Sequence, residues 1–151
     1  MLRSNLPVKQ NPLFKPLLLP SVYRRKPQEQ SAHDKAIEEI ALYYHNQGKY
    51  VRADHINWLH GKPEKTGFHI PDVTVYDYTG ISIFEVETLD SALTPHSISQ
   101  IRSFCNEGKT TLLLVLPKVT IYNQRYVESE VNEIFSRFNK LRLNNLIIKT
   151  L

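Results

Sequence analysis

Three acidic residues stand on two adjacent short segments in the middle of this chain. Asp72 follows Pro71 at the start of the first segment, and Glu85 and Glu87 lie late in the second. If the segments are strands of one hairpin, Glu85 and Glu87 share one face, because side chains alternate along a strand. Carboxylates held close together repel one another, and a hard divalent cation such as Mg²⁺ relieves that repulsion. A cation held in this way activates water and offsets charge on a phosphate, so the pattern indicates phosphodiester cleavage.

The hairpin that would position these acids is itself indicated by the sequence. Val73 and Val75 alternate with polar or aromatic residues in the segment 71–78, and the segment 81–88 is again rich in strand-forming residues. Thr79-Gly80 between them is a tight-turn signal. Two antiparallel strands, 71–78 and 81–88, are therefore predicted.

Three helices and three further strands are expected around this hairpin. Ser31 followed by Asp34 resembles a capping box with Asp in place of Glu, and it opens a helical repeat of apolar residues. The helices are predicted over residues 32–47, 95–106 and 126–140, and the strands over 50–58, 110–116 and 146–151. Residues 110–116 are nearly all apolar, which suits a central strand covered on both faces. A hairpin beside a strand reached through a helix predicts a three-layer α/β domain over residues 31–151, with a mixed sheet.

This order of elements and acids resembles the PD-(D/E)xK nuclease superfamily, which has the restriction endonuclease-like fold. The resemblance covers about residues 31–120 and rests on Pro71-Asp72 and on Glu85-Val86-Glu87. It implies a DNA endonuclease in which Asp72 and Glu85 bind Mg²⁺ or Mn²⁺, with the backbone carbonyl of Val86 as a third ligand. Glu87 stands where the superfamily usually has Lys, although a few of its restriction enzymes use Glu there.

The superfamily often carries a further acidic residue on its first helix. Asp34, Glu38 and Glu39 are the candidates in this chain. At about 100° per residue, Asp34 falls nearest the apolar stripe that contains Ile37, so Asp34 is expected to face the sheet. The expected catalytic residues are thus Asp72, Glu85, Glu87 and Asp34.

Two other interpretations of the acids remain open. Glu87 in place of Lys also suits a catalytically inactive relative, which binds DNA or a protein within a larger DNA-processing complex. The acids could alternatively be the solvated face of an exposed hairpin, where charges are ordinary edge protection. Ile81 and Ile83 share the face of Glu85, which speaks against a purely solvated face.

Positive charge is concentrated before the predicted domain. Residues 1–31 contain six basic residues against Glu29 alone, while the rest of the chain carries 13 basic and 14 acidic residues. A basic, proline-rich arm over residues 1–30 is therefore expected, with Arg24, Arg25 and Lys26 contacting the phosphates of DNA. A solvated tail is the alternative. The superfamily often contacts DNA in or just after the second helix, where this chain has Gln100, Arg102 and Lys109. A solvated helix face is again the alternative.

Composition limits the class of protein. A chain of 151 residues with 41% hydrophobic and 23% charged residues and a net charge of +4 fits one globular domain with a tail. Its apolar runs are much shorter than the roughly 20 residues of a membrane span. With Cys105 as the single cysteine, no internal disulfide is expected and a cytoplasmic location is the default. A homodimer is expected from the resemblance, because cutting two DNA strands needs two active sites.

Overall fold

The computed structural model describes residues 27–116 and 124–151, with the backbone alone for residues 124–127. In these ranges helices and strands follow one another in the predicted order. They are α1 (Pro27–Asn46), β1 (Tyr50–Ala53), β2 (Val73–Asp77), β3 (Gly80–Thr88), α2 (Pro95–Asn106), β4 (Thr110–Leu116), α3 (Gln124–Lys140) and β5 (Leu146–Thr150). The expected α/β fold with a mixed sheet is confirmed.

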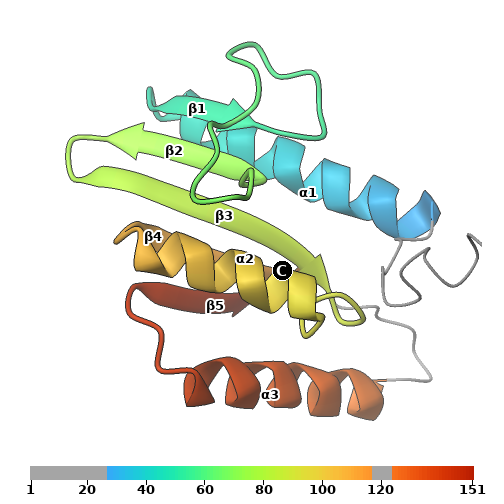
Figure 1. Cartoon of the computed structure of the whole chain (residues 1–151). Helices are drawn as coiled ribbons and strands as arrows, with labels where there is room; N and C mark the ends of the chain where they lie inside the picture. The colour runs from blue at the N-terminus through green and yellow to red at the C-terminus, as the bar shows by residue number, and fades with distance from the viewer. Residues whose placement is uncertain (1–26, 117–123) are drawn as a thin grey trace, which may run out of the picture.

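The five strands of the described part form one sheet in the order β1-β2-β3-β4-β5. β1, β2 and β3 are antiparallel neighbours, whereas β3, β4 and β5 run parallel (Figure 1). Each parallel step is made through a helix, as parallel strands require. β3 is therefore the strand at which the antiparallel half of the sheet joins the parallel half.

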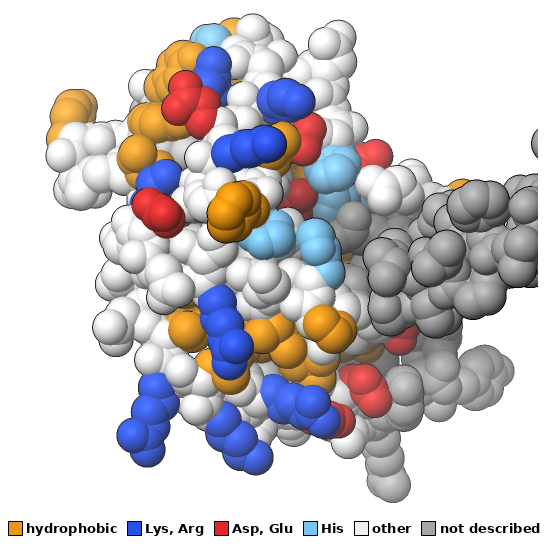
Figure 2. Space-filling view, viewed as in Figure 1, with side chains coloured by type: hydrophobic (Ala, Val, Ile, Leu, Met, Phe, Trp, Pro, Cys, Tyr) orange, Lys and Arg blue, Asp and Glu red, His pale blue; other side chains and the backbone are white. Residues whose placement is uncertain are grey.

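The helices cover both faces of the sheet and define two cores. On one face Phe84 and Val86 of β3 pack with Ile37 of α1. On the other face the apolar side chains of α2 and α3 pack against Leu113 and Val115 of β4. Successive side chains of β3 thus point to opposite cores, which confirms that Glu85 and Glu87 lie on the α2 side. Figure 2 shows Lys, Arg and His side chains gathered on this side of the molecule together with hydrophobic ones.

The start of the first helix was predicted five residues too late. α1 begins at Pro27 instead of residue 32, so Ser31 lies inside the helix and does not cap it. Proline is favoured in the first helical turn, since its missing N–H would have no helical partner there and its φ is already helical. The predicted boundary between the arm and the domain, at residues 30 and 31, therefore falls within α1.

The first strand is shorter than the predicted range 50–58. β1 ends at Ala53 because the backbone reverses at His55, which has a left-handed φ of 62°. Trp58 then folds back, and its Nε1 donates to the carbonyl of Val51 at 2.7 Å. Aromatic and β-branched residues after Ala53 led to the longer predicted strand, but these residues belong to the loop after β1.

Other boundaries agree closely with the sequence signals. α2 and β4 have the predicted bounds, and the Thr94 side chain caps α2 by accepting from the N–H of Ser97 at 3.2 Å. The bounds of β2, β3, α3 and β5 differ from prediction by one or two residues at an end. None of the helices in residues 27–116 and 124–151 is long and apolar enough to cross a bilayer.

Gly67 approaches α2 so closely that a side chain would collide there. A Cβ at Gly67, whose φ is +62°, would lie 2.1 Å from Ser103 Oγ, whereas Gly48 at φ +80° has no atom within 4 Å of that position. Gly48→Ala is expected to lower the free energy of unfolding by about 1–2 kcal/mol through the left-handed backbone alone. Gly67→Ala is expected to lower it by about 1 kcal/mol more, because the Ser103 hydroxyl must give up its hydrogen bond.

Urea unfolding of both variants, each with and without Ser103→Ala, tests this expectation. The nearest remaining atom of residue 103 is its Cβ, 3.5 Å away, so Ser103→Ala should remove the difference between the two glycine variants. Equal losses at both glycines in the wild-type background would contradict the proposed collision.

Candidate functional site

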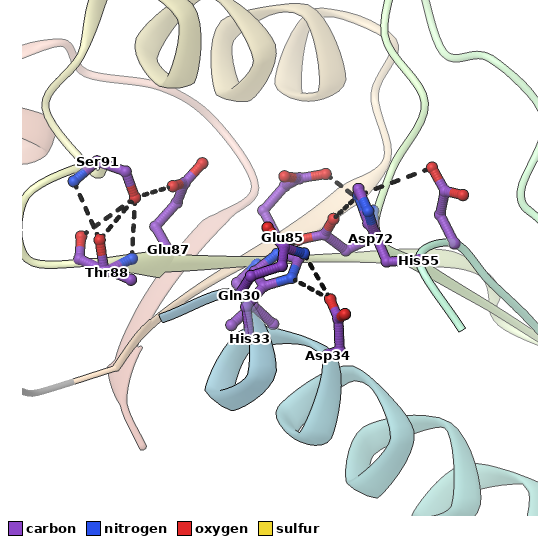
Figure 3. A network of polar contacts seen from close by, with 11 residues as sticks. Gln30, His33, Asp34, His55, Asp72, Glu85, Glu87, Thr88 and Ser91 are labelled. Atoms are coloured by element: carbon purple, nitrogen blue, oxygen red, sulfur yellow. Dashed lines mark hydrogen bonds and ion pairs between the residues drawn. The ribbon is translucent and has the colours of Figure 1, made fainter. Parts of the chain in front are cut away.

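Asp72 lies immediately before β2, at the end of the sheet where β1, β3 and α1 meet (Figure 3). Its backbone carbonyl accepts from the N–H of Asp54 at 2.8 Å, so the β1–β2 pairing continues one step beyond the two strands. The residue is only 4% exposed. A carboxylate placed here needs compensating partners, because burial disfavours its charged form.

The partners of the Asp72 carboxylate come from three segments of the chain. Oδ2 accepts from the N–H of Val86 at 2.8 Å and contacts His33 Nε2 at 3.2 Å. Oδ1 lies 3.4 Å from His55 Nε2. Burial acts to raise the pKa of Asp72, but the hydrogen bonds with both histidines and with the Val86 N–H outweigh it and hold the pKa well below its ordinary value. Asp72 is therefore an anion at neutral pH.

Glu85 and Glu87 rise from β3 on the side that faces α2, but they turn to different partners. Glu85 Oε1 accepts from the backbone N–H of Asp72 at 3.0 Å. Glu87 Oε2 accepts from the Ser91 hydroxyl, in the turn that leads to α2. Both side chains are buried, at 2% and 4% exposure. The structure thus links Glu85 to the backbone of Asp72, and it places Glu87 on the same face with its carboxylate turned toward Ser91 (Figure 3).

Asp34 contacts a histidine of this centre instead of Asp72. Its Oδ1 contacts His33 Nδ1 at 3.1 Å and accepts from Gln30 Nε2 at 2.7 Å, while its side chain keeps 33% exposure. His33 is fully buried and lies between the carboxylates of Asp34 and Asp72. The expectation that Asp34 itself faces the sheet is wrong, because His33 occupies the sheet-facing position of that turn.

Two residues of α1 were missed by sequence reasoning although a signal for them existed. The apolar stripe through Ala41 and Ile37, extended back in steps of four, passes through His33 and Glu29. Glu29 is buried at 7% exposure on this stripe. It was assigned to the arm because the helix was predicted to begin after it.

His55 is the accessible member of the centre and carries a prediction about pH. Its hydrogen bond with Asp72 raises the pKa of the imidazole above the ordinary 6.5, and burial of the ring opposes this shift only in part. Charged His55 therefore contributes fully to stability below pH 6.5, and that contribution is lost as pH rises through its higher folded pKa.

An NMR titration of the histidine ring protons between about pH 5 and pH 9 measures this shift. We expect the midpoint of His55 to lie above 6.5 in the wild type and to fall in Asp72→Asn, which lacks the negative charge. The same His55 midpoint in both proteins would show that Asp72 does not set the charge on this ring.

Three of the predicted DNA-contacting residues lie on α2 or just after it. Arg102 is exposed on α2 and Gln100 is half-buried. Lys109 precedes β4 and donates from Nζ to Thr66 Oγ1 at 2.9 Å. It stands about 13 Å along the strand from Leu113, the register partner of Glu85, so it does not supply a charge to the acids. The predicted contacts Arg24, Arg25 and Lys26 lie outside the described residues.

Comparison with known proteins adds no family. No protein-family model, no curated protein and no solved structure matches this chain.

The acidic residues of the centre carry oxygen atoms of the kind that a hard cation binds. Asp72, Glu85 and Glu87 provide carboxylate oxygens and Val86 provides a carbonyl, which are ligands that Mg²⁺ and Mn²⁺ prefer. Among residues 27–116 and 124–151, no three His, Cys, Asp or Glu side chains are already gathered closely enough to hold a metal ion. A cation at Asp72 therefore requires the side chains of the acids to move closer together than they now are.

Proposed function

We propose that this chain is a divalent-metal-dependent DNA endonuclease of the restriction endonuclease-like fold. The observation that carries the proposal is the meeting of Asp72, from the start of β2, with Glu85 of β3, both almost excluded from solvent. Glu87 follows on the same face of β3. The mixed sheet with helices on both faces supports the proposal, since it is the architecture that the sequence resemblance implies.

In this proposal Asp72, Glu85 and the carbonyl of Val86 hold Mg²⁺ or Mn²⁺. The ion supplies an activated water and offsets the charge on the phosphate during cleavage. His33 is a positioning residue, because it fixes the Asp72 carboxylate from α1. His55 is 40% exposed beside Asp72 and can donate a hydrogen bond to a phosphate oxygen. Glu87 adds a third negative charge on the ion's side of β3.

Cleavage and metal binding, measured on the full chain, test the function. We expect nicking of supercoiled plasmid, single-stranded DNA or branched DNA with Mg²⁺ or Mn²⁺, and none in EDTA. Calorimetry should show binding of either ion to the protein without DNA. Folded protein that leaves all three substrates intact with both ions would rule the endonuclease out, and an RNA substrate in the same panel separates a ribonuclease.

The second candidate function is an inactive module that binds DNA or a protein within a larger complex. It is favoured by the hydrogen bonds that already occupy the Asp72 carboxylate and by the attachment of Glu87 to Ser91. No uptake of Mg²⁺ or Mn²⁺ at millimolar concentration would support it over the enzyme. The proposed homodimer is tested separately by light scattering after gel filtration, with and without DNA, where a strict monomer in both would contradict it.

A further inference from the structure

A two-residue turn in the loop between β1 and β2 carries an aromatic ring into solvent. Thr66 and His69 pair through two backbone hydrogen bonds, at 2.8 and 3.3 Å, and leave Gly67 and Phe68 at the tip. Phe68 is 94% exposed. Burying a phenylalanine side chain is worth about 1.5–3 kcal/mol, so a ring kept outside the core is available to a partner.

The base of this turn is fixed to the body of the protein. Thr66 is buried, its Oγ1 accepts from Lys109 Nζ at 2.9 Å, and its carbonyl accepts from Ser103 Oγ at 3.4 Å. The ring of His69 packs edge-on against His96 and Phe104 of α2, with centroid distances of 5.5 and 6.3 Å. Phe68 is therefore displayed from an anchored turn, so little conformational freedom has to be lost on binding.

Three basic residues accompany the turn, and one exposed acidic residue, Glu107, stands at the C-cap of α2. Lys65 is exposed three residues before Phe68, Lys109 contacts the base of the turn, and Arg102 is exposed next to Ser103. Glu64, the acidic neighbour of Lys65, lies 3.4 Å from the guanidinium of Arg52. Figure 2 shows Lys, Arg and His side chains on this side of the molecule, interspersed with hydrophobic and acidic ones. A protein-binding hot spot is typically enclosed by further contacts that exclude water, whereas an aromatic ring among cations suits a base flanked by phosphates.

We propose that Phe68 stacks on an unpaired base of a nucleic-acid strand, whose phosphates lie against Lys65, Arg102 and Lys109. The chain runs from the turn directly through Pro71 to Asp72, and α2 faces the side of β3 that carries Glu85 and Glu87. A nucleic-acid strand bound at the turn is thus held on the side of the sheet where Glu85 and Glu87 lie. The inference rests on the proposed function for its ligand class, but it is tested by binding, without cleavage.

Fluorescence anisotropy with a labelled single-stranded oligonucleotide in EDTA is the experiment. We expect Phe68→Ala to raise the Kd about tenfold, because base–aromatic stacking is lost, while Phe68→Tyr keeps most of the affinity. Tyr78→Ala is the matched control, since Tyr78 is an equally exposed aromatic on the β2–β3 turn, and its Kd should equal that of the wild type. Lys65→Gln should lower the slope of log Kd against log salt by about 0.7.

The outcomes separate this inference from the proposed function. If the wild type binds the strand but Phe68→Ala binds it equally well, or Tyr78→Ala weakens binding as much, the stacking role is overturned whatever the enzyme does. If binding depends on Phe68 and cleavage is absent, the inference stands and the endonuclease fails. If the wild type does not bind the oligonucleotide, the inference is overturned, and a protein partner becomes the interpretation of the exposed Phe68 ring. Phe68, Tyr78 and Lys65 are all exposed, so each variant should keep the wild-type urea midpoint. An unchanged midpoint shows that the variant protein is folded.

Discussion

Asp72→Asn is expected to reduce metal-dependent DNA cleavage about 10³-fold while the protein stays folded. The amide oxygen can still accept from the N–H of Val86, so the hydrogen bond to β3 is kept. The negative charge that would bind the cation is lost, and with it about 4 kcal/mol of transition-state stabilisation. Initial rates of plasmid nicking, measured at saturating Mg²⁺, give the comparison directly.

Asp77→Asn is the control for Asp72→Asn, because it makes the same change at the other end of β2. Asp77 accepts from the N–H and the hydroxyl of Thr79 in the hairpin turn and lies 3.3 Å from Lys49 Nζ, so its contacts are at the opposite end of β2 from Asp72. Its nicking rate should equal that of the wild type. Full activity of Asp72→Asn would show that Asp72 serves only to tie the strands and α1 together.

Asp72→Asn also changes how the free energy of unfolding depends on pH. Because the folded pKa of Asp72 is lowered, its charged form stabilises the protein above the unfolded pKa of about 3.9, and this contribution is lost as pH falls through the folded value. The difference in unfolding free energy between the wild type and Asp72→Asn should therefore shrink as the pH is lowered below about 4.

Glu87→Gln is expected to reduce cleavage about 10²-fold and to lower the free energy of unfolding by about 1 kcal/mol, because a hydrogen bond to a charged group becomes one to a neutral group. The glutamine side-chain oxygen can still accept from the Ser91 hydroxyl, so the hydrogen bond to the β3–α2 turn is kept and only the charge is lost. Nicking rates and urea unfolding are measured on the same preparations.

Ser91→Ala removes the hydrogen bond and leaves the Glu87 carboxylate in place, so it is the complementary variant. It removes the donor to Glu87 and also the acceptor of the Thr88 N–H, so it should cost about 1 kcal/mol of stability and change cleavage only a few-fold. If Glu87→Gln keeps full activity, Glu87 is a structural partner of this turn and the site has two carboxylates.

Elements with strong local signals were predictable from the sequence. The range 95–106 was predicted for α2, and the apolar run of β4 indicated an inner strand with both faces covered. The alternation along β3 correctly separated Glu85 from Val86. These features depend on neighbouring residues, which a sequence displays directly.

The side-chain partners at the site could not be predicted in the same way. His33 contacts Asp72 across 39 residues, and the contact depends on how α1 is placed over the sheet. The attachment of Glu87 to Ser91 depends on the path of the turn before α2, which periodicity does not describe. The left-handed backbone of His55, which ends β1, has only a weak signal in residue type, since histidine is enriched at positive φ but adopts it rarely.

The spacing of these contacts along the chain has a consequence for how the centre assembles. Asp72 and Glu85 are 13 residues apart, whereas Asp72 and His33 are 39 apart. Closing the longer loop costs about 1 kcal/mol more in chain entropy. The hairpin therefore brings the two acidic residues together at a lower cost in chain entropy than the first helix brings the imidazole that contacts Asp72. Docking of α1 onto the sheet is thus accompanied by a buried polar contact as well as by apolar packing, and the two together define where the helix lies.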